Sequence, residues 1–318
     1  YVPNLPRNKA LPRGAAWESP DVLDEAYADG RVATHTINRL RTLSQKVDKP
    51  FFMALGFARP HLPFSVPKKY WDMYDKDQIP MPEFEQDPAG APTFSVKRRG
   101  EIDQFSPVPE NGEPFSEDLK RNLIHGYYAS VSYMDAQLGR VIDELDRLDI
   151  LDNTIIVLWG DHGWHLGEKQ HWRKFALWEE TTRIPMIWVA PGVTKPGTKC
   201  SQPVDTMSIY PTLCSLTGIK KPGHVSGHDI SPLLRNPKAK WQHPAITTHG
   251  RGNHSVRTAT KRYIRYADGS EEYYDHAKDP YEWKNLAATS ELSRFEKWIP
   301  KNEVASQALK KTSKKPKK

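Results

Sequence analysis

Residues 154–168 constrain the fold of this chain more than any other segment, because an apolar run there ends in a polar loop rich in glycine. The run Thr154-Ile155-Ile156-Val157-Leu158 is typical of a strand covered on both faces, as in the parallel sheet of an α/β domain. It leads into Gly160-Asp161-His162-Gly163, so a carboxylate and an imidazole follow the carboxyl end of the strand, where α/β sheets bind ligands. The bare tripeptide Asp-His-Gly fits an ordinary turn equally well, and the flanking sequence must decide.

Strands and helices alternate along most of the chain, which predicts an α/β fold with a mostly parallel sheet and helices on both faces. The spacing of apolar residues predicts a helix over 29–47 and a longer one that begins after Ser116 and runs to about Leu145. Residues 78–114 are rich in proline, glycine and charge and are predicted to form a long irregular segment. Further elements are expected as strands at 51–57 and 185–190 and as a helix at 205–216.

The pattern changes at about residue 243, beyond which the strands are short. They are expected at 245–249, 255–260, 262–266 and 272–275, and Asp268-Gly269 predicts a hairpin turn between the last two. We therefore predict a large α/β domain over 1–242 and a small antiparallel α+β subdomain over 243–300. A basic tail over 301–318 is expected to be disordered.

Composition excludes several function classes. The chain has 318 residues, of which 37% are hydrophobic, enough to bury a substantial core. Its apolar runs are far shorter than the ~20 residues of a membrane helix, so no membrane insertion is expected. The formal net charge of +7 depends on six lysines in the last nine positions, and without them it is about +1. No nucleic-acid partner is therefore predicted, although the tail could attract an anionic polysaccharide weakly. The sequence does not indicate an oligomeric state.

The two cysteines carry little information about fold or chemistry. Cys214 falls in a predicted helix and is expected to be a small buried apolar residue, whereas Cys200 lies in a polar loop. Two cysteines make no disulfide framework, and a bridge between them stays open at this point.

Two more motifs accompany the Asp161 loop and give it a family resemblance. Upstream, residues 50–64 place His61 between two prolines after a run that contains Phe51-Phe52, and downstream Lys174 ends His171-Trp172-Arg173-Lys174. In this order and spacing the motifs resemble the sulfatases of the alkaline-phosphatase superfamily, and most closely the iduronate-2-sulfatase-like branch. The resemblance extends over about residues 29–286, with further matching segments at 204–213, 227–234 and 274–282.

The resemblance implies hydrolysis of a sulfate ester on a sulfated sugar or polysaccharide. His61 and Lys174 are then the expected catalytic residues, because an ammonium group is a compact charge for an anion and an imidazole titrates near working pH. Asp161 and His162 are the expected metal ligands. Substrate contacts are expected from Trp164, His165 and His171, with His165, His171 and Glu168 open to a supporting role or to a zinc cluster.

The resemblance also implies Ca²⁺ as the metal. The carboxylate of Asp161 suits Ca²⁺ or Mg²⁺, whereas the imidazole of His162 is a more typical ligand of Zn²⁺. The iduronate-type branch nonetheless has histidine here and uses calcium, so Zn²⁺ and Mg²⁺ are the less favoured choices. The same resemblance predicts a periplasmic or secreted protein.

The nucleophile expected for this family has no match in the chain. Sulfatases carry a Cys-x-Pro-Ser-Arg signature whose cysteine is oxidised to formylglycine, whereas Cys200 is followed by Ser201-Gln202-Pro203 and Cys214 by Ser215-Leu216-Thr217. We expect the formylglycine in an upstream part of a longer enzyme. The chain then corresponds to the carboxyl-terminal two-thirds and would be inactive by itself.

Two alternative functions stay open. The Asp161-His162 pair also suits a zinc-dependent phosphomonoester or phosphonate hydrolase of the same superfamily. The lack of a nucleophile would also suit a non-catalytic carbohydrate-binding protein.

Overall fold

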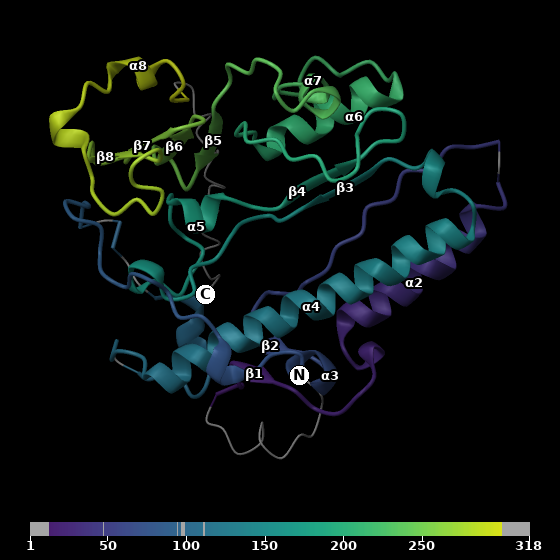
Figure 1. The fold of residues 1–318 in the computed structure, drawn as a ribbon, viewed down its shortest axis with the longest axis horizontal. Helices are drawn as coiled ribbons and strands as arrows, with labels where there is room; N and C mark the ends of the chain where they lie inside the picture. The colour runs from purple at the N-terminus through teal and green to yellow at the C-terminus, as the bar shows by residue number, and fades with distance from the viewer. Residues whose placement is uncertain (1–12, 47, 94, 97–98, 111, 301–318) are drawn as a thin grey trace, which may run out of the picture.

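The computed structural model describes residues 13–46, 48–93, 95–96, 99–110 and 112–300. Two long helices lie side by side, and a strand pair, a helical cap and a four-stranded sheet lie across from them (Figure 1). The helices are α2 (Ala28–Leu43), α3 (Lys68–Trp71), α4 (Glu117–Arg147), α5 (Glu179–Thr182), α6 (Ile209–Thr217), α7 (Ser231–Arg235) and α8 (Ser293–Glu296). The strands are β1 (Trp17–Glu18), β2 (Phe64–Ser65), β3 (Ile156–Trp159), β4 (Met186–Val189), β5 (Ala245–Thr248), β6 (His254–Arg257), β7 (Lys261–Arg265) and β8 (Glu271–Asp275).

Helices α2 and α4 confirm the two predicted helices. The Ser116 hydroxyl caps α4 by accepting the Leu119 N–H group at 3.2 Å, as the sequence predicts. Tyr133, which is fully buried on α4, joins the two helices: its hydroxyl accepts the Gly30 N–H group at 2.7 Å and donates to the Asp24 carbonyl at 2.9 Å. A side chain at position 30 would collide with that carbonyl, so the close approach requires glycine.

Strands β3 and β4 confirm the predicted apolar strands on either side of the Asp161 loop. They pair antiparallel, with Ile156 opposite Val189 and Trp159 opposite Met186. The chain leaves β3 and returns to β4 at the same end, where the Gly160 N–H group donates to the Pro185 carbonyl at 3.2 Å. A parallel pair would need a crossover helix, and the short α5 does not provide one. Apolar side chains on this pair are open to solvent: Ile187 is 52% exposed, Trp159 48% and Val189 43%.

Residues 51–57 depart from the prediction. They pair with no other strand among the described residues, so the predicted strand is wrong as an element. Met53, Leu55 and Phe57 pack against the cluster that contains Ala33, Leu40 and Val141, whereas the residues between them are exposed and Phe52, which precedes them, is 84% exposed. The alternation predicted for a strand is therefore present without the hydrogen-bonded ladder. Among the named strands that the structure describes, the two-residue strands β1 and β2 form the parallel pair.

The carboxyl-terminal part forms the predicted antiparallel sheet, in the order β5-β6-β7-β8. Gly269, with φ of 87°, turns the chain between β7 and β8 and donates its N–H group to Tyr266, which confirms the predicted hairpin. The predicted irregular segment at 78–114 is also confirmed, since the described residues from 79 to 110 hold only one short 3-10 turn, η3 (Glu101–Gln104). The α/β class with a carboxyl-terminal antiparallel sheet is thereby established, while the domain boundary at residue 243 stays a prediction.

The helix predicted at 205–216 is present as a 3-10 turn, η6 (Thr206–Ser208), followed by α6. Cys214 on α6 is buried and Cys200 is exposed, and both are free thiols. Among the described residues, no helix combines the length and apolar character needed to cross a membrane. The predicted tail at 301–318 lies outside the described residues.

Candidate active site

Asp161 and His162 lie directly beyond the end of β3, as the sequence predicts. The Asp161 side chain is 86% exposed, and its Oδ1 accepts the backbone N–H group of His162 at 3.0 Å. The His162 Nδ1 atom lies 2.8 Å from the Gly163 carbonyl, so Nδ1 carries the proton and donates it there. The Nε2 lone pair is therefore free, and it lies 3.4 Å from Asp161 Oδ2.

These two atoms suit one shared cation. A nitrogen and an oxygen at this separation can both reach a single ion, and neither donor type excludes Ca²⁺ or Zn²⁺. They are only part of a coordination shell, because Ca²⁺ takes six to eight oxygen ligands. Within the described part of the chain, no third histidine, cysteine or carboxylate completes a cluster with them.

Gly163 anchors this loop to α5. Its N–H group donates to the Thr181 carbonyl at 2.8 Å, and a Cβ atom at this position would lie 2.1 Å from the Glu180 carbonyl oxygen. Only glycine allows so close an approach between the two backbones. The conformation of Asp161 and His162 thus depends on contact with α5.

The segment that carries Lys174 runs back along the Asp161 loop. The His165 N–H group donates to the Arg173 carbonyl at 3.2 Å, and the Gly167 N–H group donates to the His171 carbonyl at 3.0 Å. The Lys174 ammonium lies 6.0 Å from the ring centroid of Trp164. The two motifs that are separate in sequence therefore share one region of the structure.

Lys174 and His61 meet, which the sequence motifs alone could not establish. Lys174 Nζ lies 3.1 Å from His61 Nε2. His61 Nδ1 lies 2.7 Å from the Leu62 carbonyl and carries the ring proton, so Nε2 accepts a hydrogen bond from the ammonium. A third group joins them: the Glu101 carboxylate lies 3.2 Å from Lys174 Nζ and 3.4 Å from His61 Nε2.

The loop of His61 is held by a buried carboxylate on α2. Asp29 is 3% exposed and accepts the backbone N–H groups of Ala58 and Arg59, each at 2.9 Å. The Arg59 guanidinium in turn donates to the His61 carbonyl at 2.9 Å and to the Ser65 carbonyl at 3.0 Å. His61 is exposed, but its backbone is fixed from both sides.

His165 and His171 do not occupy the place predicted for them. Both side chains are fully buried, so the expected contact with substrate is wrong for this structure. His171 Nδ1 lies 2.6 Å from the Lys169 carbonyl, and its pKa is lowered to about 4, first by burial and then by the charge of His165. Both histidines support the loop from the protein interior. Trp164 is half-buried at the edge of the core, and its predicted role in substrate binding stays a prediction.

A buried ion pair fixes the loop between the two motifs. The Lys169 side chain is fully buried and its ammonium lies 2.6 Å from Glu180 Oε1, while His165 Nε2 lies 3.3 Å from Glu180 Oε2. Burial alone would raise the pKa of Glu180, but His165 and Lys169 outweigh it and hold this pKa well below its usual range. Glu180 therefore connects α5 with His165 and Lys169 of the loop.

A second group of metal-type ligands is neutralised by arginine. Glu179, His276 and Glu282 bring their ligand atoms within 4.8 Å of one another. Arg262, which is 1% exposed, contacts both carboxylates, and Arg257 lies 3.1 Å from Glu179 and 3.0 Å from His276. Burial would raise the pKa of Glu282, yet Arg262 and His276 keep it below its usual range. The group is best explained as an ion-pair cluster that joins α5 to the carboxyl-terminal sheet.

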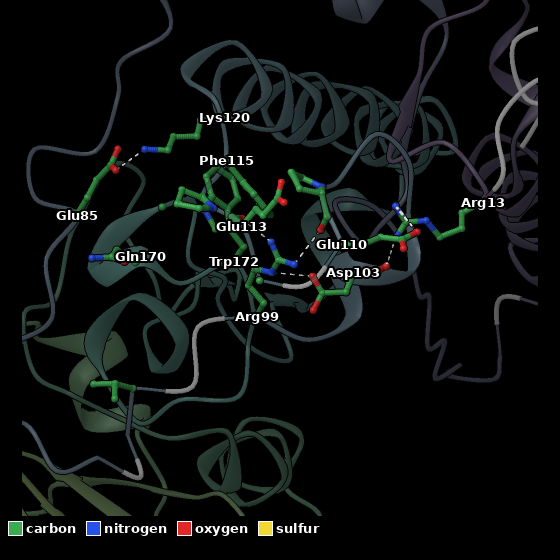
Figure 2. A pocket seen from close by; sticks show the side chains of 15 residues that line it. Arg13, Glu85, Arg99, Asp103, Glu110, Glu113, Phe115, Lys120, Gln170 and Trp172 are labelled. Atoms are coloured by element: carbon green, nitrogen blue, oxygen red, sulfur yellow. Dashed lines mark hydrogen bonds and ion pairs between the residues drawn. The ribbon is translucent and has the colours of Figure 1, made fainter.

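A cavity of about 810 Å³ adjoins the Lys174 region. Figure 2 shows Arg99 among the side chains that line it, ion-paired with Asp103 of η3 at 2.8 Å. The cavity lies next to the group formed by Lys174, His61 and Glu101, because the two share chain segments. Asp103 and Trp172 line the cavity, while Glu101 lies on the same turn η3 as Asp103 and Lys174 lies two residues after Trp172. The charged side chains that line it are of both signs: Arg13, Glu85, Arg99, Asp103, Glu110, Glu113 and Lys120.

Residues 3–219 match the family model described as sulfatase. The chain belongs to the sulfatase family. A second family model, described as the carboxyl-terminal part of N-sulphoglucosamine sulphohydrolase, matches residues 167–308 of this chain.

Curated relatives agree with this assignment. A sulfatase of Formosa agariphila is 39% identical over 249 residues, which cover 78% of this chain and 48% of that protein. Human iduronate 2-sulfatase is 30% identical over 234 residues, which cover 64% of this chain and 42% of that protein. An ulvan-active sulfatase of Formosa agariphila is 28% identical and covers 79% of this chain and 46% of that protein. The chain thus spans less than half the length of these relatives.

Solved structures show that the fold is that of alkaline-phosphatase-like sulfatases. A protein solved in complex with its substrate D-glucosamine-2-N,6-O-disulfate superimposes with a TM-score of 0.67 at 22% identity, over 86% of this chain and 68% of that one. The phosphonate monoester hydrolase of Agrobacterium radiobacter gives a TM-score of 0.72 at 22% identity, over 90% of this chain and 62% of that one.

Sequence reasoning missed three acidic residues of this region. Asp29 lies in a predicted helix, where its acceptor role toward a loop 29 residues away leaves no local pattern. Glu180 lies two residues after Trp178, in a segment with no motif, and Glu101 lies in the irregular region, where no periodicity marks any position. Contacts that are distant in sequence define all three.

Proposed function

We propose that this chain is the sulfate-binding and partly metal-binding portion of a sulfatase that removes sulfate from a sulfated sugar or polysaccharide. The observation that carries the proposal is the convergence of Lys174 and His61 at 3.1 Å, beside the loop of Asp161 and His162. The Lys174 side chain is 16% exposed, so its charge is little screened by water. A partly buried ammonium beside an imidazole is suited to an anionic ester group.

Each residue of the site has a proposed part in ester hydrolysis. Lys174 balances charge on the nonbridging oxygens of the sulfate group. His61, when it carries a proton on Nε2, can donate it to the leaving alkoxide. Asp161 and His162 would hold a Ca²⁺ ion, which supplies Lewis-acid stabilisation of the developing negative charge when bound.

The nucleophile is proposed to be a formylglycine outside this chain. Neither Cys200 nor Cys214 stands in the signature that sulfatases oxidise, and Cys214 is buried. The short span relative to the curated relatives is consistent with a longer enzyme. We infer that this chain does not turn over substrate without that residue.

A sugar substrate fits the surroundings of Lys174. Phe175 is 48% exposed, stacks on His249 at a centroid distance of 5.4 Å, and lies 5.7 Å from the Lys174 ammonium. A half-exposed aromatic ring next to an anion site suits contact with a sulfated sugar. The names of the relatives, iduronate 2-sulfatase and ulvan-active sulfatase, point the same way. A periplasmic or secreted location and an iduronate-2-sulfatase-like type belong to this proposal.

A second candidate is zinc-dependent hydrolysis of phosphate or phosphonate esters. The free Nε2 lone pair of His162 favours it, since imidazole is a preferred ligand of zinc. Zinc would need only two further ligands to complete four-fold coordination.

The decisive experiment compares two esters on the product of the complete gene, coexpressed with a formylglycine-generating enzyme. We expect hydrolysis of 4-nitrophenyl sulfate and of sulfated disaccharides, with little hydrolysis of 4-nitrophenyl phosphate. Hydrolysis of the phosphate ester alone would establish the second candidate instead. Binding of sulfated sugar without hydrolysis of either ester would favour a non-catalytic carbohydrate-binding protein.

A further inference from the structure

The carboxylate of Glu101 lies where the proposed function expects the sulfate group. One oxygen is 3.2 Å from Lys174 Nζ and the other is 3.4 Å from His61 Nε2. The two groups that Glu101 contacts are the same two that we propose to bind the ester. Among the described residues, Glu101 is the carboxylate within ion-pair distance of Lys174.

Glu101 is placed there by an anchored turn. The next residue, Ile102, is 1% exposed and belongs to the core cluster that also contains Phe64 and Trp172. Asp103 pairs with Arg99 at 2.8 Å, and its carbonyl accepts a hydrogen bond from the Arg13 guanidinium. Because the two residues that follow Glu101 are anchored in this way, its side chain can turn toward or away from Lys174 without a change in η3.

Charge prevents Glu101 and a sulfate group from contacting Lys174 together. The side chains of Lys174 and Glu101 are 16% and 26% exposed, so a pair of like charges a few ångströms apart would be weakly screened. Conversely, Lys174 would lose its observed carboxylate partner if Glu101 rotated away with no anion to replace it. Exchange of one anion for another keeps the ammonium neutralised throughout.

We propose that Glu101 is a specificity-determining residue, an internal anion that occupies the sulfate position and is exchanged for the sulfate group when substrate binds. This inference rests on the proposed function of Lys174 and His61. Once displaced, the carboxylate stays tethered nearby by η3 and repels the bound ester. A dianionic phosphate monoester is repelled more than a monoanionic sulfate monoester, so Glu101 selects between the two ester classes by charge.

The test measures the affinity of the protein for inorganic sulfate by calorimetry at constant ionic strength. We expect Glu101→Gln to tighten binding about tenfold, because the amide is a similar shape without the competing charge. The matched control is Glu83→Gln, which removes an exposed carboxylate from the same irregular segment and should leave the affinity unchanged. Thermal unfolding of each variant verifies that it is folded.

The outcomes separate this inference from the proposed function. Tighter binding in Glu101→Gln that is lost in Glu101→Gln/Lys174→Ala supports both. Binding that needs Lys174 but is equal in wild type and Glu101→Gln overturns the role of Glu101 alone. No sulfate binding in wild type or in Glu101→Gln overturns the sulfate site itself.

A separate experiment tests whether Glu101 selects sulfate esters over phosphate esters by charge. Competition of 4-nitrophenyl sulfate and 4-nitrophenyl phosphate against bound inorganic sulfate gives the relative affinity of the two esters. We expect Glu101→Gln to strengthen binding of the phosphate ester more than that of the sulfate ester. Equal strengthening would overturn the selectivity, and weaker binding of both would assign Glu101 an attractive role instead.

Discussion

Asp29 Oδ2 accepts the backbone N–H group of Arg59 at 2.9 Å, and Asp29 Oδ1 accepts that of the preceding Ala58 at the same distance. A single buried carboxylate on α2 thereby sets the position of the loop that presents His61. The distance between His61 and Lys174 depends on this support, although Asp29 is not among the groups that contact Lys174.

Replacement of Asp29 should loosen that loop. Asp29→Ala removes two charge-assisted hydrogen bonds, and we expect the free energy of unfolding to fall by about 3 kcal/mol, measured with urea. Asp29→Asn keeps one acceptor oxygen and should lose about half as much. Equal stability of Asp29→Ala and wild type would mean that the loop is held by other contacts.

Gly163→Ala should disturb the Asp161 loop. The new Cβ atom would lie 2.1 Å from the Glu180 carbonyl oxygen, so the backbone must shift, at a cost of about 1 to 3 kcal/mol in unfolding free energy. Gly139→Ala is the matched control, because its Cβ meets no atom within 4 Å and alanine favours the α4 helix by about 0.5 to 1 kcal/mol. We expect the free energy of unfolding to fall in Gly163→Ala and to rise in Gly139→Ala. A change in the same direction in both variants would contradict the close contact at Gly163.

Lys174→Ala should slow hydrolysis of 4-nitrophenyl sulfate by the complete gene product. Loss of one preorganised electrostatic donor lowers kcat by about 10² to 10³-fold. Lys68→Ala, which removes an exposed lysine paired with Asp72, should leave kcat unchanged. Unchanged turnover in Lys174→Ala would remove this lysine from the reaction.

The stability of the protein should depend on pH through His171. Its pKa is about 4 in the folded chain, against an ordinary value of 6.5, so the unfolded chain binds more protons between these pH values. The free energy of unfolding should therefore fall by about 3 kcal/mol as the pH is lowered from 6.5 to 4. His171→Asn should flatten this dependence, and an unchanged profile would show that another group causes it.

Asp161→Asn should weaken calcium binding without unfolding the protein. The carboxylate is exposed, so its charge serves no packing role, and its loss should reduce calcium affinity at least about tenfold in a calorimetric titration. Asp152→Asn, in an exposed turn before β3, is the control. An unaffected affinity in Asp161→Asn would place the metal elsewhere, and tighter binding of zinc than of calcium would favour the second candidate function.

The sequence pattern predicted correctly those elements that are determined by interactions between residues near one another in the chain. The helix after Ser116 and the strands of the carboxyl-terminal sheet follow from apolar spacing, capping and turn residues. The partners of strands are set by distant parts of the chain, which is why residues 51–57 alternate correctly and yet have no ladder among the described residues.

The same distinction holds for the site. Asp161, His162, His61 and Lys174 were predicted from motifs, and the structure brings His61 and Lys174 into contact. The burial of His165 and His171 depends on how Trp178 and α5 cover them, and the position of Glu101 depends on a core contact of its neighbour. Neither is encoded in the spacing of nearby residues.

The exposed apolar side chains on β3 and β4 have a practical consequence. Trp159, Ile187 and Val189 present a hydrophobic, strand-forming surface to solvent, which is a template for edge-to-edge aggregation. We expect samples of this chain to self-associate as concentration rises, and dilution series by light scattering would detect it. A charged substitution at Ile187 would then be the first choice for keeping the protein monodisperse during titrations.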